Sequence, residues 1–101
     1  MQGVVFMKET SVPKRRCVVL NYTDAPGKRV AVAGSFNDWQ PVKMLNDRNN
    51  DGHYSCRLML PPGTYQYKFY VDGQWRSDAG NPDFVPNEFG SLNSVLQIEE
   101  K

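Results

Sequence analysis

The sequence has 101 residues, of which 40% are hydrophobic, 12% aromatic and 23% charged. This length allows one domain with a core of its own and is too short for two. Twelve basic and 11 acidic residues leave a formal net charge of +1, which argues against a nucleic-acid binder or a polybasic membrane-surface domain, because both carry a basic excess.

The first half of the chain predicts short strands separated by turns. Helical periodicity is almost absent, and Pro and Gly recur at intervals of roughly 8–12 residues, which is typical of an all-β sandwich. Residues 1–13 are expected to form a loose arm before a domain at 14–101. The alternating segments predict strands at 14–22, 29–33 and 53–60, with a short extended piece at 44–45 and a polar turn at 47–52.

The second half contains the clearest predicted strand, Thr64 to Asp72 (TYQYKFYVD). Period-2 alternation puts one set of its side chains in the core, namely Tyr65, Tyr67, Phe69 and Val71. Asp72-Gly73 is predicted to form a two-residue hairpin turn of the primed type. A return strand follows at 74–76, then an irregular segment at 78–90 and a closing strand at 92–99 in which Leu92, Leu96 and Ile98 are in phase.

Cysteine and histidine usage points away from a metal site. Cys17 and Cys56 are the two cysteines and His53 is the single histidine, so a structural zinc site lacks ligands. We interpret the cysteines as separate, buried, reduced thiols, with a disulfide between neighbouring strands as the alternative. The N-terminus has no basic segment ahead of an apolar core, so we predict no secretory signal and a cytoplasmic location.

Both tryptophans are predicted to lie at turns. Trp39 lies in the polar loop 35–41, and Trp75 directly follows the Asp72-Gly73 turn. Each has polar neighbours in the sequence, unlike a tryptophan in the middle of an apolar strand. The plain structural interpretation is that one of them closes an edge of the sandwich. The functional interpretation is that both present a flat ring to a ligand.

Exposed indole rings suit a sugar ligand. An indole covers the C–H face of a pyranose, while polar side chains bond the hydroxyl rim. Lys68 is expected to point outward on the strand that precedes Trp75 and to donate to hydroxyls. Asn93 carries both a donor and an acceptor, although a turn asparagine that bonds its own backbone is an equal alternative.

Three ordered segments resemble family 48 carbohydrate-binding modules. VAGSFNDW at 32–39 is similar to their G-S-F-N-x-W signature, YQYKFYVDGQW at 65–75 to Y-x-Y-K-F-x-V-D-G-x-W, and NEFGSLNSV at 87–95 to the segment that leads into the last strand. The resemblance covers about residues 15–99. Within the family it is strongest to the glycogen-binding domains of AMP-activated protein kinase β subunits, with isoamylase and branching-enzyme N-terminal domains also similar.

The resemblance implies an immunoglobulin-like (early-set) β-sandwich that binds α-1,4-glucans such as glycogen and starch without catalysis or cofactor. It also implies a partner enzyme or kinase that is brought to the polysaccharide. The family's stacking tryptophans fall on Trp39 and Trp75, and its hydroxyl-bonding residues on Lys68, Ser91 and Asn93. A leucine of the family that reaches into the curve of the glucan is replaced here by Phe89, whose bulkier ring could stack on the sugar instead of inserting and so bears on the preference for linear, branched or cyclic glucan.

Other functions fit the residues less well. The segment at 47–52 opens like a calcium loop, but Leu58 stands where the bidentate Glu is needed, so we interpret the segment as a β-turn. Cys56 and His53 differ by an odd number of positions on one strand, so their side chains point to opposite faces and form no dyad. The near-neutral charge disfavours single-stranded nucleic acid. A protein-interaction sandwich that has lost sugar binding remains the alternative function.

Overall fold

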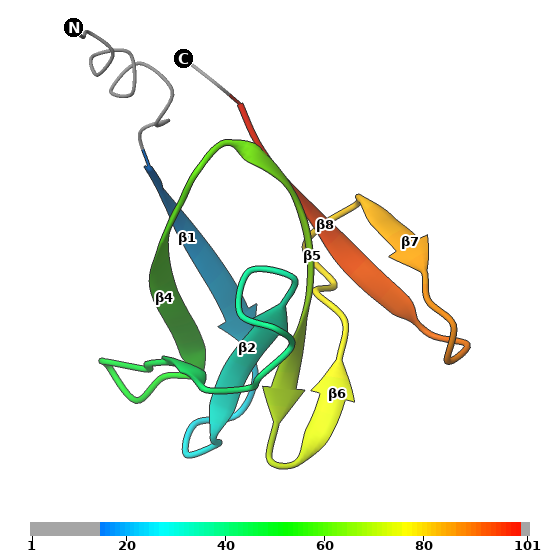
Figure 1. Ribbon diagram of the computed structural model, residues 1–101. Coiled ribbons are helices and arrows are strands. Elements are labelled where there is room, and N and C mark those ends of the chain that lie inside the picture. Colours follow the sequence, from blue (N-terminus) through cyan, green and yellow to red (C-terminus); the bar gives the residue numbers. More distant parts are fainter. Residues whose placement is uncertain (1–14, 100–101) are drawn as a thin grey trace, which may run out of the picture.

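A computed structural model describes residues 15–99 of the chain (Figure 1). The predicted arm at 1–13 lies outside these residues. Within 15–99 the chain forms strands, turns and bends but no helix, and therefore no helix that could cross a membrane. The strands are β1 (Arg16–Thr23), β2 (Val30–Gly34), β3 (Lys43–Leu45), β4 (His53–Leu60), β5 (Gly63–Val71), β6 (Gln74–Arg76), β7 (Phe84–Pro86) and β8 (Leu92–Ile98).

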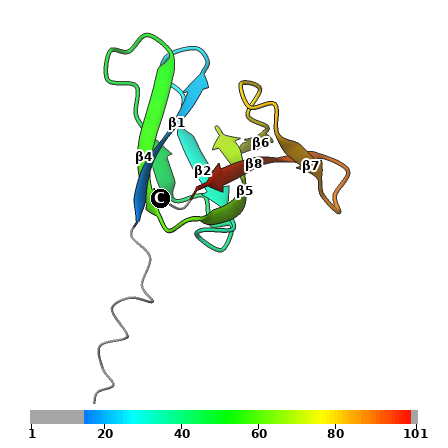
Figure 2. The same ribbon diagram turned by 90° about the horizontal axis from the view of Figure 1, so that it is seen from above.

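Two antiparallel sheets pack as a sandwich, which confirms the predicted fold class. One sheet contains β1 and β4, and the other has the order β3-β2-β5-β8-β7. Strand β5 pairs with β2 along one edge and, along the other, first with β8 and then with β6. Figure 2 shows the β7–β8 hairpin extending away from the layer formed by β1 and β4. The larger sheet is therefore covered only in part.

The core lies between the sheets and follows the predicted alternation. Strand β4 alternates strictly between exposed and buried positions, because successive side chains point to opposite faces. Tyr67, Phe69 and Val71 of β5 are buried as predicted, and Tyr65 is half-buried at the margin of the core. The core residues are Leu20, Val30, Val32, Leu45, Tyr54, Cys56, Leu58, Leu60, Tyr67, Phe69, Val71 and Ile98.

Two sequence-based expectations are wrong in detail. The segment 78–90 is not wholly irregular. Residues 84–86 form strand β7 because they pair with β8, with Val85 opposite Asn93. Both thiols are free, but Cys17 is exposed, since it lies on the outer face of β1, which no other strand within residues 15–99 covers. Leu92 is in phase with the buried Ile98, as predicted, and is itself 37% exposed.

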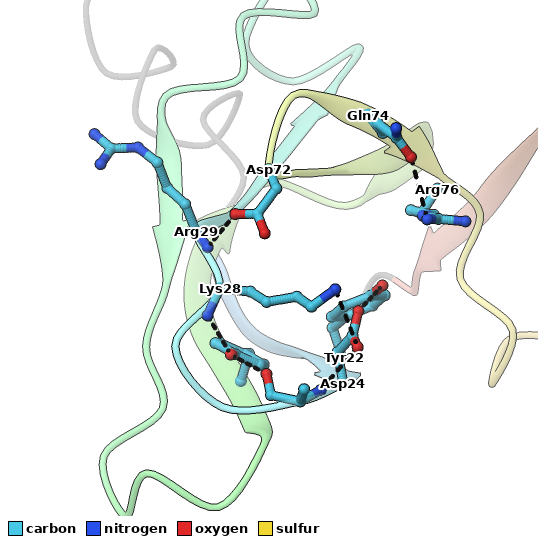
Figure 3. A network of polar contacts seen from close by, with 9 residues as sticks. Tyr22, Asp24, Lys28, Arg29, Asp72, Gln74 and Arg76 are labelled. Atoms are coloured by element: carbon cyan, nitrogen blue, oxygen red, sulfur yellow. Dashed lines mark hydrogen bonds and ion pairs between the residues drawn. The ribbon is translucent and has the colours of Figure 1, made fainter.

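The Asp72-Gly73 turn joins β5 to β6. Both residues have positive φ, 48° and 84°, as a type I′ turn requires, which confirms the prediction. The Asp72 carboxylate accepts a hydrogen bond from the Arg29 backbone N–H at 2.8 Å (Figure 3). In the same region Tyr22 donates to Asp24, so polar contacts tie the β1–β2 connection to this end of the sandwich.

Candidate functional site

The loop that carries Trp39 is fixed to β5 by close backbone contacts. A Cβ atom at Gly34 would lie 2.5 Å from the Gln66 carbonyl oxygen, so only glycine allows this approach. The Ser35 N–H donates to that carbonyl at 2.9 Å, and the Ser35 hydroxyl accepts from the Gln66 N–H. Phe36 packs against the core beside Tyr65. These contacts set where the loop leaves the sheet.

Within this loop the backbone is strained at the tryptophan itself. Asp38 and Trp39 have φ values of 57° and 58°, in the left-handed region that is uncommon for residues other than glycine. The Trp39 N–H donates to the Gly34 carbonyl at 2.9 Å, and the Asn37 carboxamide oxygen accepts from the Gly34 N–H. These bonds close the loop and offset the strain. The Trp39 side chain stays 36% exposed instead of closing an edge of the sandwich.

Trp75 is presented by the three-residue strand β6. It pairs across the strands with Tyr70 on the outer face of β5, and the two rings lie 4.7 Å apart at an interplanar angle of 55°. Aromatic cross-strand pairs of this kind stabilise a sheet and restrict the ring. Trp75 remains 46% exposed while its ring packs against Tyr70.

The connection between β7 and β8 forms the third part of the site. Phe89 at its tip is 84% exposed. The side chain of Asn87 accepts hydrogen bonds from the N–H groups of Phe89 and Ser91, at 2.9 and 3.1 Å. The Asn87 N–H in turn donates to the Ser91 carbonyl. This single asparagine therefore gives the loop its shape.

A chain of hydrogen bonds forms a polar floor between the aromatic rings. Lys68 Nζ donates to Ser91 Oγ at 2.9 Å, and Asn87 Nδ2 donates to both Ser91 Oγ and Asn93 Oδ1. Asn93 Nδ2 then donates to Gln66 Oε1 at 3.0 Å. Asn93 thus bonds other side chains, and the alternative of a turn asparagine bonding its own backbone is wrong.

Lys68 differs from its expected exposure. It lies on the outer face of β5 as predicted, but only 8% of it is exposed. Its Nζ bonds Ser91 in the β7–β8 connection, which period-2 analysis of β5 alone does not reveal. The ammonium is therefore held in place instead of being free to move in solvent.

The three parts border one groove of about 710 Å³. All six residues predicted from the sequence line it, and the strand pairing brings them together from four separate segments. Sequence reasoning missed three further lining residues, Gln66, Asn87 and Glu88. Gln66 shares its strand face with Lys68 and was therefore open to prediction, whereas nothing in the sequence pattern marks Asn87 as an organiser of the loop. Chemically, the groove combines flat apolar rings with a floor rich in hydrogen-bond donors.

No cluster of three or more His, Cys, Asp or Glu side chains in residues 15–99 is placed to hold a metal ion. At the calcium-like segment, the Asp47 carboxylate accepts hydrogen bonds from the N–H groups of Asp51 and Gly52, at 3.0 and 2.7 Å. These bonds close a tight turn between β3 and β4, as interpreted from the sequence.

Comparison with known proteins shows the family of the chain. Residues 17–101 match the family described as the glycogen recognition site of AMP-activated protein kinase. The chain is 35% identical over 94 residues to 5'-AMP-activated protein kinase subunit beta-1 of Rattus norvegicus, which covers 93% of this chain and 33% of the subunit. It is 36% identical over 85 residues to subunit beta-2 of Mus musculus, covering 84% of this chain and 30% of that subunit. The chain thus spans about a third of the length of these relatives, and it belongs to the family of AMP-activated protein kinase glycogen recognition domains.

Proposed function

We propose that the domain binds α-1,4-glucans such as glycogen, starch and malto-oligosaccharides in this groove, without catalysis. Trp39 and Trp75 stack on glucose rings, while Lys68, Ser91 and Asn93 bond hydroxyl groups. Phe89 shapes the groove between them. The observation that carries the proposal is that two exposed indoles border the same groove as a floor of hydrogen-bonded polar side chains.

The expected affinity is moderate. Covering roughly 50–80 Å² of apolar surface on each indole contributes about 1–2 kcal/mol. Two rings and a few hydrogen bonds, less the cost of association, correspond to dissociation constants of roughly mM to µM. Moderate affinity of this kind suits attachment to a polymer that offers many equivalent glucose units.

A localising role follows from the relatives. Their names identify them as subunits of a kinase, and this chain matches about a third of each of them. We infer that the domain brings an attached or associated kinase or glycan-active enzyme to the polysaccharide. This role uses binding alone and needs no reaction at the groove.

Calorimetry and intrinsic tryptophan fluorescence during titration with maltoheptaose and β-cyclodextrin test the proposal. We expect saturable binding below about 10 mM, with an affinity loss of about five- to thirtyfold in Trp39→Ala and in Trp75→Ala, the equivalent of about 1–2 kcal/mol per ring. Phe84→Ala is the matched control, because Phe84 is an exposed aromatic residue on the opposite face of the sheet from Asn93. It should bind like the unmutated protein.

Two outcomes contradict the proposal. Absence of binding by the unmutated protein below about 10 mM would exclude glucan recognition and favour the alternative of a protein-interaction sandwich. Unchanged affinity in both tryptophan variants would place the binding site elsewhere.

Comparing the affinities of maltoheptaose and β-cyclodextrin for Phe89→Leu then shows whether the phenyl ring sets the preference between linear and cyclic glucan.

A further inference from the structure

The side chain of Asn87 uses its entire hydrogen-bonding capacity inside the protein. A carboxamide offers two N–H donors and two acceptor positions on its oxygen. The oxygen accepts from the Phe89 and Ser91 N–H groups, and the nitrogen donates to Ser91 Oγ at 2.8 Å and Asn93 Oδ1 at 3.0 Å. The two backbone donors also fix which carboxamide atom is the oxygen. Although Asn87 lines the groove, its side chain has no donor or acceptor left for a ligand.

These bonds determine what Ser91 offers to a ligand. A serine hydroxyl has two acceptor positions and one hydrogen. Lys68 Nζ and Asn87 Nδ2 occupy both acceptor positions of Ser91 Oγ, at 2.9 and 2.8 Å. The remaining hydrogen must therefore point away from Lys68 and Asn87. Ser91 is thus oriented as a donor.

Asn93 is oriented in the same way. Its oxygen accepts from Asn87, and its nitrogen donates to Gln66 Oε1, so the carboxamide cannot flip without breaking both bonds. Asn93 is 8% exposed, and one N–H of its carboxamide remains for a ligand. Asn87 therefore sets the orientation of two neighbouring polar groups at once.

We propose that Asn87 is a positioning residue of the glucan site, which acts by turning the Ser91 hydroxyl and the Asn93 carboxamide into fixed donors toward sugar oxygens. This inference rests on the proposed glucan binding. It differs from direct contact, because Asn87 itself bonds no sugar. Pre-orientation raises affinity, since the floor does not lose rotational freedom when the ligand binds.

The test is Asn87→Asp, which keeps the shape of the side chain and an oxygen to accept from the Phe89 and Ser91 N–H groups. Its second oxygen replaces the donor nitrogen, so the Ser91 hydroxyl turns to donate to it and the Asn93 oxygen is repelled. We expect maltoheptaose affinity to fall about tenfold, the effect of losing one to two net hydrogen bonds. Affinity is measured by calorimetry at a temperature at which each variant is folded.

Asn81→Asp is the matched control. The Asn81 carboxamide also donates two hydrogen bonds, to Tyr67 and to the Val95 carbonyl, and accepts one from Asp83, but it does not line the groove. This variant should lose stability and keep its affinity for maltoheptaose. Equal affinity loss in both asparagine variants would show a general structural effect and overturn the inference.

A double-mutant cycle separates positioning from stability. In a Ser91→Ala background the hydroxyl donor is absent, so Asn87→Asp should cost clearly less affinity than in the unmutated protein. Additive losses would overturn the inference. If Asn87→Asp does not fold, hydrogen exchange of the side-chain amides in the unmutated protein tests the inference instead. Slow exchange of the Asn87 amide both without and with maltoheptaose supports positioning, and fast exchange without ligand refutes it.

The outcome is distinguishable from failure of the proposed function. If the unmutated protein binds no glucan, the proposed function itself is wrong. If it binds and Asn87→Asp binds equally well, glucan recognition stands and the role of Asn87 is refuted.

Discussion

At the scale of single residues, the site depends on backbone positions as much as on the side chains that face the groove. Gly34 and Trp39 illustrate this. The first permits β2 to approach Gln66, and the second is held with φ at 58° by a bond back to Gly34. Left-handed strain in a non-glycine residue costs of order 1–3 kcal/mol and persists only where surrounding contacts enforce it. The exposed indole is thus the product of a rigid loop.

Replacing Gly34 by alanine should therefore destabilise the fold and disturb Trp39 together. The added Cβ meets a backbone oxygen at 2.5 Å, which cannot move aside as a flexible side chain could. We expect a loss of about 2–3 kcal/mol in the free energy of unfolding, measured by urea denaturation. Gly80→Ala is the control, since its Cβ would be at ordinary contact distance, 3.5 Å from Asp78. Equal stability of the two variants would contradict the argument.

At the scale of elements, the sequence predicts strands with a regular alternation and fails where an element depends on its partner. Strand β4 and the buried face of β5 follow period-2 burial and were predictable. Strand β7 was not predictable, because a segment of three residues that ends in Pro86 gains strand geometry only by pairing with β8. Burial of Lys68 and the role of Asn87 were missed for the same reason. Both depend on the β7–β8 connection, which local pattern does not place.

The turn between β3 and β4 gives the fold a dependence on acid pH. Partial desolvation acts to raise the pKa of Asp47, but hydrogen bonds from the Gly52 and Asp51 N–H groups outweigh it and hold this pKa below its ordinary value of 3.8. A carboxylate with a lowered pKa in the folded state stabilises the fold above its unfolded pKa, and this contribution is lost as pH falls through the folded pKa.

Asp47→Asn should therefore lower the thermal unfolding midpoint at pH 7 and progressively less below about pH 4, where the wild-type carboxylate also becomes protonated. Calorimetric scans of both proteins from pH 7 to pH 2.5 measure this difference. Parallel curves across the whole range would show that the charge of Asp47 contributes nothing to stability. A difference that widens in acid would mean that the sign of the pKa shift is wrong.

At the scale of the whole molecule, one face of the larger sheet packs in the core and the other lines the groove. The inner face of β5 closes the core with β4, and its outer face supplies Gln66 and Lys68 to the groove. Because the β1–β4 layer covers one face only, the face that carries the groove stays open without loss of core. The aromatic residues divide accordingly, with Tyr54, Tyr67 and Phe69 in the core and Trp39, Trp75 and Phe89 at the groove.

The near-neutral charge of the molecule then predicts how binding responds to salt. The formal net charge is +1, and an α-glucan carries no charge, so binding releases no condensed counterions. Raising NaCl from about 50 to 500 mM should change the dissociation constant for maltoheptaose less than about twofold, whereas binding that neutralises several phosphates falls by orders of magnitude. Calorimetric titrations at four salt concentrations measure the slope, with Lys68→Met as a check on the single ammonium in the floor. A steep slope that disappears in Lys68→Met would show that the groove recognises an anion, and would contradict a neutral glucan as its ligand.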